Sequence, residues 1–186
     1  MTTRYVLDTN VLIPYFSKDF FLELGMRGLP IHWSLPIEAE YRAVWTRLYP
    51  NNPANAAKVL NLMRLTVPDW RAPLSRKVLT AAKLPDVKDR HVLAAAVGIG
   101  PTVIVTWNLK DFPAAVLNVH GVEARTPDDV LCDLFNDDPD GFTAAAAAMR
   151  ARMKNPVMTP RAWLKGVEAS GLKQLAMKLS AVSGRL

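Results

Sequence analysis

Short apolar runs alternate with longer stretches of helical periodicity over the first two thirds of the chain. The sequence predicts strands at residues 5–7, 29–34, 102–106 and 122–124, and the third is continuously apolar, as in a buried parallel strand. Between these runs, apolar residues recur at spacings of three and four, which predicts helices. Strands that alternate with helices in this way predict an α/β fold with a central parallel sheet and right-handed crossovers.

Capping residues give the expected helix boundaries. Short polar side chains at a helix start accept hydrogen bonds from free backbone N–H groups. The residues expected to do so are Asp19, Ser34, Ser75 and Thr126. An alanine-rich helix is expected over residues 90–97, with Gly98 and Gly100 ending it.

Past residue 136 the pattern becomes purely helical and strongly basic. Residues 141–186 hold eight Lys or Arg and a single acid, Glu168, so they contribute +7 to a net charge of +6. The sequence predicts two parts, an α/β domain at 1–136 and a basic helical C-terminal extension at 137–186. The charge asymmetry favours an anionic partner for the extension, although a solvated helical face has the same composition.

Composition excludes several classes of protein. The chain of 186 residues has one cysteine, Cys132, so it has neither an internal disulfide nor a cysteine metal cluster. The N-terminus lacks the apolar run of a signal peptide, and the most apolar stretch, 92–105, is interrupted and too short to span a bilayer. We expect a soluble cytoplasmic protein with no membrane contact.

Acidic residues fall where the strands and helices of such a sheet converge. They are Asp8, Glu38 or Glu40, Asp86 or Asp89, and Asp111. Ligands of open α/β sheets gather at the carboxyl ends of the strands. Crowded carboxylates repel one another, and one or two Mg²⁺ or Mn²⁺ ions relieve that repulsion through oxygen ligands. A cation held in this way can activate water and neutralise charge on a phosphodiester.

Most of these residues also have a structural interpretation. Asp8 suits an Asx-turn or a helix cap, and Asp86 suits an N-cap, the role we favour for it. Glu38 can pair with Arg42 four residues later, whereas Glu40 has no such partner. Helical geometry alone does not choose between the two glutamates.

The remaining candidate residues give no support for histidine-based or phosphatase chemistry. The three histidines lie among apolar neighbours and are interpreted as structural; they are His32, His91 and His120. A haloacid-dehalogenase-type phosphatase would need an aspartate two residues after Asp8, and Asn10 stands there instead.

Four segments together resemble the PIN-domain family. They are residues 6–13 (VLDTNVLI), 40–44 (EYRAV), 86–96 (DVKDRHVLAAA) and 105–113 (VTWNLKDFP). The resemblance covers roughly residues 4–131. It implies a three-layer α/β/α sandwich and metal-dependent ribonuclease activity. Many bacterial members are VapC-like toxins of type II toxin–antitoxin systems, held inactive by a small antitoxin protein.

The resemblance also implies a site. By position, the family's four acidic ligands match Asp8, Glu40, Asp89 and Asp111. Asn10 and Asn108 fall at polar positions beside them, and Thr9 and Thr106 are expected to support the site by hydrogen bonding. Relatives of this kind often form homodimers, which makes a homodimer a candidate assembly, although this sequence carries no dimer-specific signature.

The leading hypothesis is an endoribonuclease in which Asp8, Glu40, Asp89 and Asp111 hold Mg²⁺ or Mn²⁺ and activate water against RNA. The toxin role and the antitoxin partner are implied by the resemblance. The alternative is a catalytically silent PIN-like module that binds RNA or a protein. The extension is expected either to guide RNA through phosphate contacts or to cover an apolar surface.

Overall fold

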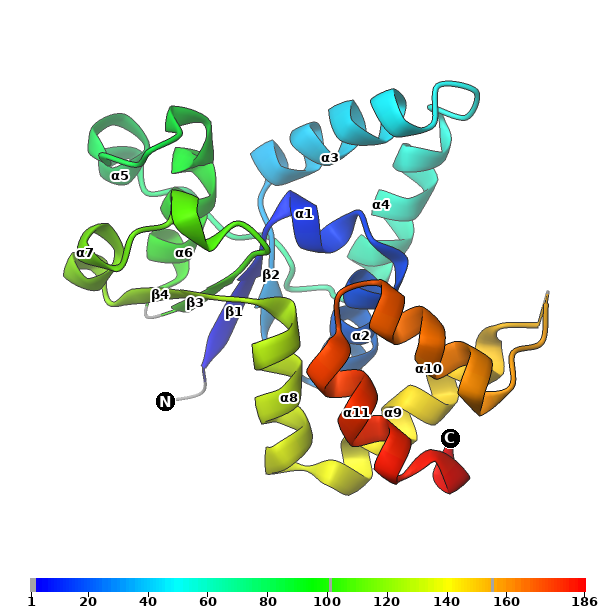
Figure 1. Ribbon diagram of the computed structural model, residues 1–186. Helices are drawn as coiled ribbons and strands as arrows, with labels where there is room; N and C mark the ends of the chain where they lie inside the picture. The colour runs from blue at the N-terminus through cyan, green and yellow to red at the C-terminus, as the bar shows by residue number, and fades with distance from the viewer. Residues whose placement is uncertain (1–2, 101, 155) are drawn as a thin grey trace.

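A parallel sheet forms the centre of the α/β part of the computed structural model, which describes residues 3–100, 102–154 and 156–186 (Figure 1). Its strands are β1 (Arg4–Leu7), β2 (Ile31–His32), β3 (Thr102–Val105) and β4 (Val122–Arg125), in the order β2-β1-β3-β4. Tyr5 pairs with Ile31 on one side and with Val103 on the other, and Val103 pairs with Glu123. All four predicted strands are therefore confirmed.

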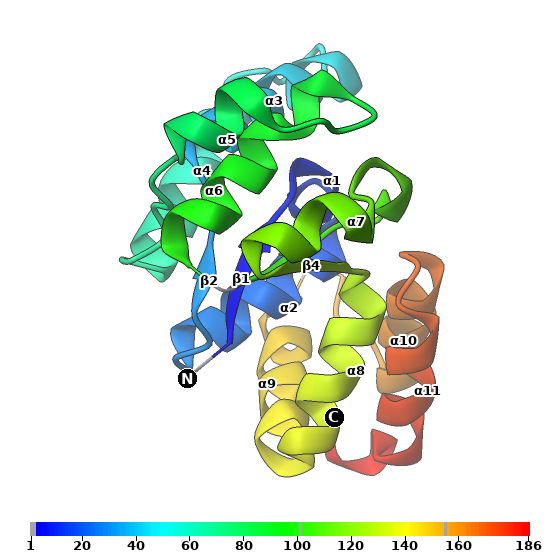
Figure 2. The same cartoon turned by 90° about the vertical axis from the view of Figure 1, so that its left-hand side faces the viewer.

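Helices cover both faces of this sheet. They are α1 (Thr9–Leu12), α2 (Tyr15–Met26), α3 (Leu35–Leu48), α4 (Asn55–Thr66), α5 (Arg76–Ala81), α6 (Arg90–Ile99), α7 (Ala114–Leu117) and α8 (Pro127–Asp137), with 3₁₀ turns η1 (Val87–Asp89), η2 (Leu109–Asp111) and η3 (Asn118–His120). Figure 2 shows the sheet between a group containing α3, α5 and α6 and a group containing α2 and α8. This is the α/β/α sandwich that the resemblance to the PIN-domain family implied.

Two of the four predicted caps accept hydrogen bonds as expected. The Ser34 hydroxyl accepts from the Ile37 N–H at 3.5 Å, and the Thr126 hydroxyl accepts from the Asp129 N–H at 3.2 Å. Ser75 stands at the N-cap of α5 without a side-chain capping bond. Local side-chain chemistry thus sets the starts of α3 and α8.

The prediction that Asp19 starts a helix is wrong. Helix α2 begins four residues earlier, at Tyr15, and Pro14 holds the N-cap position. Phe16, in the added turn, meets Trp163 edge to face at 5.8 Å between ring centroids. That contact comes from the C-terminal helices, so packing between distant segments favours the earlier start over the local signal at Asp19.

The prediction that Gly98 ends the alanine-rich helix is also wrong. Helix α6 continues through Gly98 to Ile99, and Gly100 ends it with φ of +95°. A Cβ at position 98 would lie 1.9 Å from the Pro73 carbonyl oxygen. Gly98 is therefore needed for the close approach of the segment before α5, while Gly100 supplies the left-handed conformation that ends α6.

The C-terminal part of the chain is helical, as predicted. Its elements are α9 (Pro139–Arg152), α10 (Pro160–Ala169), α11 (Lys173–Ala181) and η4 (Ser183–Arg185), and they lie beside α8 and α2 (Figures 1 and 2). Trp163, Val167, Leu175 and Leu179 are fully buried. The division of the chain into two parts at residue 137 stays a prediction. Helix α8 ends at that residue, and Asp138 caps α9 directly afterwards, so no linker separates the two helices.

Polar contacts bind these helices to the rest of the molecule. The buried Glu23 carboxylate on α2 pairs with Arg152 of α9 at 2.5 Å and with Arg27 at 3.0 Å. The buried Asp128 carboxylate on α8 accepts from the N–H groups of Gln174 and Leu175, at 2.9 and 3.0 Å. Asp128 therefore caps α11 from a different helix, which leaves the first turn of α11 without the need for a cap of its own.

The turn between α10 and α11 touches a loop that leaves the sheet. Gly171 has φ of +96°, and a Cβ added there would come within 3.1 Å of the Trp107 ring. Trp107 directly follows Thr106 at the carboxyl end of β3. The extension thus contacts the edge of the sheet where the acidic residues gather.

No helix in the described ranges is both long enough and apolar enough to cross a membrane.

Candidate active site

All four predicted site residues line one cleft at the carboxyl edge of the sheet. The cleft has a volume of about 380 Å³. Asp8 follows β1, Glu40 lies on α3, Asp89 ends η1 and Asp111 ends η2. Asn10, Asp86, Asn108 and Arg47 also line it. Four segments that are far apart in sequence thus place carboxylates around a single space.

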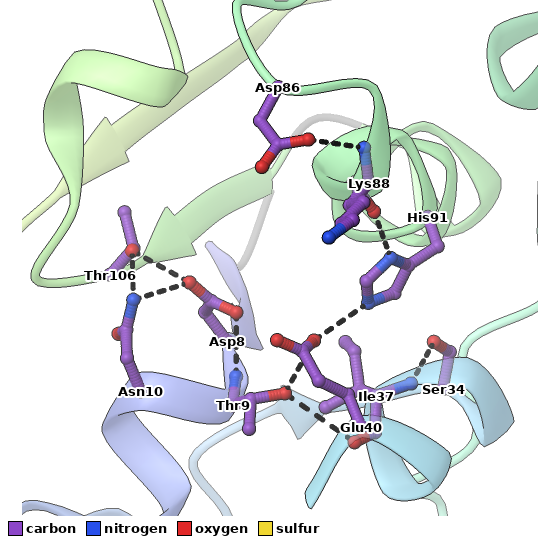
Figure 3. Close-up of polar contacts among 10 residues, drawn as sticks. All are labelled: Asp8, Thr9, Asn10, Ser34, Ile37, Glu40, Asp86, Lys88, His91 and Thr106. Atoms are coloured by element: carbon purple, nitrogen blue, oxygen red, sulfur yellow. Dashed lines mark hydrogen bonds and ion pairs between the residues drawn. The ribbon is translucent and has the colours of Figure 1, made fainter. Parts of the chain in front are cut away.

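Asp8 is the most tightly held of these carboxylates (Figure 3). It is 7% exposed and stands at the N-cap of α1, where Oδ1 accepts from the Thr9 N–H at 2.6 Å. Its Oδ2 accepts from the Thr106 hydroxyl at 2.8 Å and from the Asn10 amide at 2.7 Å. The capping role and a role in the site therefore coexist in one side chain. Burial raises the pKa of Asp8, and the nearby Glu40 charge raises it further against these hydrogen bonds.

The segment after β3 completes this side of the cleft. Asn10 Oδ1 accepts from the Trp107 N–H at 3.0 Å, and the Thr106 hydroxyl oxygen accepts from the Asn108 N–H at 3.0 Å. The Asn108 amide in turn donates to the Asp111 carboxylate. The hydrogen-bonding support expected from Thr106 is present, and the chain of contacts runs from Asp8 to Asp111.

The structure separates the two glutamates of α3. Glu38 is 2% exposed and accepts from Trp33 Nε1 at 3.1 Å and Arg64 Nε at 2.8 Å, whereas Arg42 lies 4.0 Å away. Arg64 on α4 is thus its main partner, and Glu38 points into the fold. Glu40 lines the cleft instead.

Glu40 has two neighbours that orient its carboxylate. The Thr9 hydroxyl donates to Glu40 Oε2 at 2.9 Å, and His91 Nε2 lies 3.3 Å from the same oxygen (Figure 3). His91 Nδ1 is 2.6 Å from the Lys88 carbonyl, which can only accept, so Nδ1 carries a proton. The contact with His91 holds the pKa of Glu40 below its usual value despite partial burial.

His91 contacts a candidate site residue, which its interpretation as a structural histidine did not predict. Burial alone would lower its pKa, but contact with Glu40 and the Lys88 carbonyl outweighs burial and raises it. Contact with Glu40 therefore favours the charged form of His91, in which both ring nitrogens carry protons. Spacing gave no signal for this pair, because 51 residues separate the two positions.

Asp86 and Asp89 both line the cleft but differ in their hydrogen bonding. Asp86 caps η1 by accepting from the Lys88 N–H at 2.8 Å, which is the structural role expected for it. Asp89 makes no capping bond. Burial raises the pKa of Asp89 to about 6, with further contributions from the charges of Asp8, Asp86, Asp111 and Glu40. The four acidic neighbours named here show that the cleft concentrates negative charge.

The chemistry of the donors fits a hard divalent cation. Carboxylate and amide oxygens are the ligands that Mg²⁺ and Mn²⁺ prefer. A cation would relieve the repulsion between carboxylates that contributes to the raised pKa of Asp89. Over residues 3–100, 102–154 and 156–186, no three acidic, histidine or cysteine side chains stand in an arrangement that would chelate one ion directly. Mg²⁺ commonly keeps several waters and takes one or two carboxylates, so the donor set remains suitable.

Comparison with known proteins agrees with this geometry. The family model described as "PIN domain" matches residues 4–110, and the model described as "VapC50 C-terminal domain" matches residues 127–181. The first match covers more than half of the chain and includes three of the four candidate site residues. The chain therefore belongs to the PIN-domain family.

One curated protein is similar in sequence to part of this chain. A Mycobacterium tuberculosis protein, provisionally named ribonuclease VapC50, is 41% identical over 86 residues, which is 46% of this chain and 51% of the relative. The chain thus spans about half the length of that relative in the match. No solved structure gave a significant match.

Proposed function

We propose that this protein is a metal-dependent endoribonuclease that hydrolyses RNA phosphodiester bonds, and that it acts as the toxin of a toxin–antitoxin pair. The observation that carries the proposal is the convergence of Asp8, Glu40, Asp89 and Asp111 on one cleft. Membership of the PIN-domain family and the similarity to a relative named as a VapC ribonuclease support it. RNA is the proposed substrate, and a small antitoxin protein is the proposed inhibitor.

In this proposal the four carboxylates hold Mg²⁺ or Mn²⁺. When bound, such an ion activates water and neutralises the charge that develops on the phosphodiester. Asp8 offers an oriented carboxylate because Thr106, Asn10 and the Thr9 N–H leave it little rotational freedom. An oriented ligand binds metal without the entropic cost of ordering it.

Glu40 is the second proposed metal ligand, and its neighbours orient its carboxylate. The Thr9 hydroxyl and His91 Nε2 both approach Glu40 Oε2, which leaves Glu40 Oε1 without either contact. The low pKa of Glu40 keeps it ionised, so it can bind a cation over the physiological pH range. His91 is a positioning residue in this scheme, because it acts through Glu40.

Cleavage of single-stranded RNA and tRNA by the purified full chain tests this function. The reaction is run with Mg²⁺, with Mn²⁺ and with chelator, for the wild type, Asp8→Asn and Asp89→Asn. Asp69→Asn serves as the control, because Asp69 is exposed and lies outside the cleft. We expect metal-dependent cleavage by the wild type and the control, and loss of it in both site variants.

Cleavage that persists in chelator or in Asp8→Asn would overturn the proposed mechanism. A folded wild type without cleavage would favour the silent binding module or a co-purified inhibitor, and mass spectrometry of the preparation would distinguish these two. Growth arrest on expression that disappears with Asp8→Asn would support the toxin role.

A further inference from the structure

A second pocket adjoins the acidic cleft along helix α3. It has a volume of about 490 Å³ and is lined by Glu40, Ala43, Val44, Arg47, Lys88 and His91. Glu40, Val44 and Arg47 also line the acidic cleft, so the two spaces share a wall. A ligand that extends from the cleft along α3 therefore enters this pocket next.

The second pocket differs from the cleft in charge. Arg47 stands two helical turns after Glu40, on the same side of α3. Among the described residues, neither Arg47 nor Lys88 has a carboxylate within ion-pair distance, and both are exposed. Their charges are therefore available to a ligand.

Contact with His91, the ion-pair partner of Glu40, lowers the pKa of Glu40 most, and the Lys88 charge helps to lower it. Glu40 Oε2 is 3.3 Å from His91 Nε2, and the pair stands at the boundary between the two spaces. Ala43 and Val44 supply a short apolar wall between Glu40 and Arg47. The pocket thus combines two free cations with an apolar strip, which suits a phosphate group attached to a sugar.

We propose that Arg47 and Lys88 bind the phosphate adjacent to the scissile one in single-stranded RNA, with its ribose against Val44. This inference rests on the proposed nuclease function, because it identifies the cleft as the place of the scissile bond. Lys88 lies on η1 beside Asp89, and Arg47 lies on α3 beyond Glu40, so the two cations reach the pocket from two different elements. They set the path of the RNA across the cleft.

The test measures RNA binding separately from cleavage. Fluorescence anisotropy gives the Kd of a labelled single-stranded RNA of about 12 nucleotides, in chelator, from about 50 to 200 mM KCl. The full chain is compared with an Arg47→Gln/Lys88→Gln double variant. The control is an Arg76→Gln/Lys58→Gln double variant, which removes the same charge from exposed positions that line neither space.

Each phosphate contact on a single strand contributes about −0.7 to the slope of log K against log salt. Because both cations contact the same phosphate, their loss removes one neutralised phosphate, which is expected to make that slope shallower by about 0.7 and to weaken binding about fivefold at about 0.1 M salt. The control is expected to change Kd less than about threefold. Thermal unfolding of all variants confirms that each is folded.

An equal slope and an equal Kd for the two double variants would overturn the inference, as would a wild type that does not bind the RNA at all. If the Arg47/Lys88 variant loses binding as expected but the wild type cleaves no RNA with Mg²⁺ or Mn²⁺, the RNA site stands and the nuclease function fails. If the wild type cleaves but the Arg47/Lys88 variant binds like its control, the nuclease function stands and the proposed phosphate site fails.

Discussion

The cap that Asp128 places on α11 allows a quantitative prediction. Asp128 is 6% exposed, and its two oxygens accept from Gln174 N–H and Leu175 N–H at 2.9 and 3.0 Å. Leu172, the residue at the N-cap of α11, makes no side-chain capping bond. Replacing Asp128 with alanine would leave both N–H groups without this acceptor, the Leu175 N–H in a buried position and the Gln174 N–H in a partly buried one.

The expected loss follows from these contacts. A hydrogen bond to a charged group contributes about 1.5–3 kcal/mol, and loss of an N-cap costs about 0.5–2 kcal/mol. Because water reaches part of the exposed turn, we expect Asp128→Ala to lower the free energy of unfolding by about 2–4 kcal/mol. For a chain of this size that lowers Tm by roughly 5–12 °C. Asp128→Asn keeps one carbonyl acceptor and is expected to lose about half as much.

Circular dichroism during heating and urea unfolding measure the loss, and hydrogen exchange locates it. Amides of α11 are expected to exchange faster in Asp128→Ala, while those of β1 and β3 change less. Asp133→Ala is the matched control, because Asp133 lies on the same helix and makes a surface ion pair with Arg125 worth at most about 1 kcal/mol. If Asp128→Ala melts with the wild type and α11 keeps its protection, the capping argument is refuted.

Three further predictions follow from the same structure. Glu38→Gln removes the buried carboxylate that accepts from the partly exposed Arg64 and should lower the free energy of unfolding by about 1–3 kcal/mol in chemical denaturation, whereas a loss below about 0.5 kcal/mol would contradict this charge-assisted hydrogen bond. Gly98→Ala places a Cβ against the Pro73 carbonyl and should cost about 1–3 kcal/mol, while Gly184→Ala, with nothing within 4 Å, should be nearly neutral; equal melting temperatures for the two would contradict the close approach. The pKa of Asp89 is raised from 3.8 to about 6, so the folded chain binds this proton more tightly than the unfolded chain, and metal-free stability should fall as pH rises through about 6. Melting with chelator should show this fall in the wild type and a smaller one in Asp89→Asn, and added Mg²⁺ should reduce it by neutralising the cleft.

The sequence predicted those features that local chemistry determines. The β1 and β3 strands, the caps at Ser34 and Thr126, and the order of the elements all depend on residues within a few positions of one another. The parallel sheet then brings the carboxyl ends of β1 and β3 together, which is why Asp8 and the segment before Asp111 meet. These predictions needed only periodicity and turn chemistry.

The features that the sequence left open or missed depend on contacts between distant residues. Only the position of Arg64 on α4 shows that Glu38 is structural, which leaves Glu40 for the cleft. The start of α2 depends on Trp163, far along the chain, which packs against Phe16. His91 gains its partner because α6 starts beside α3. Such pairs carry no signature in spacing, since the fold alone brings them together.

The contact between Gly171 and Trp107 has a thermodynamic consequence. Trp107 donates its N–H to Asn10, which in turn holds Asp8, so the turn between α10 and α11 and the proposed metal ligand belong to one connected set of contacts. Coupling of this kind is reciprocal. If docking of the C-terminal helices raises the affinity for metal, bound metal must stabilise the docked helices by the same free energy. Under the same condition, a protein that binds those helices and shifts their docking would change the metal affinity of the cleft without touching it.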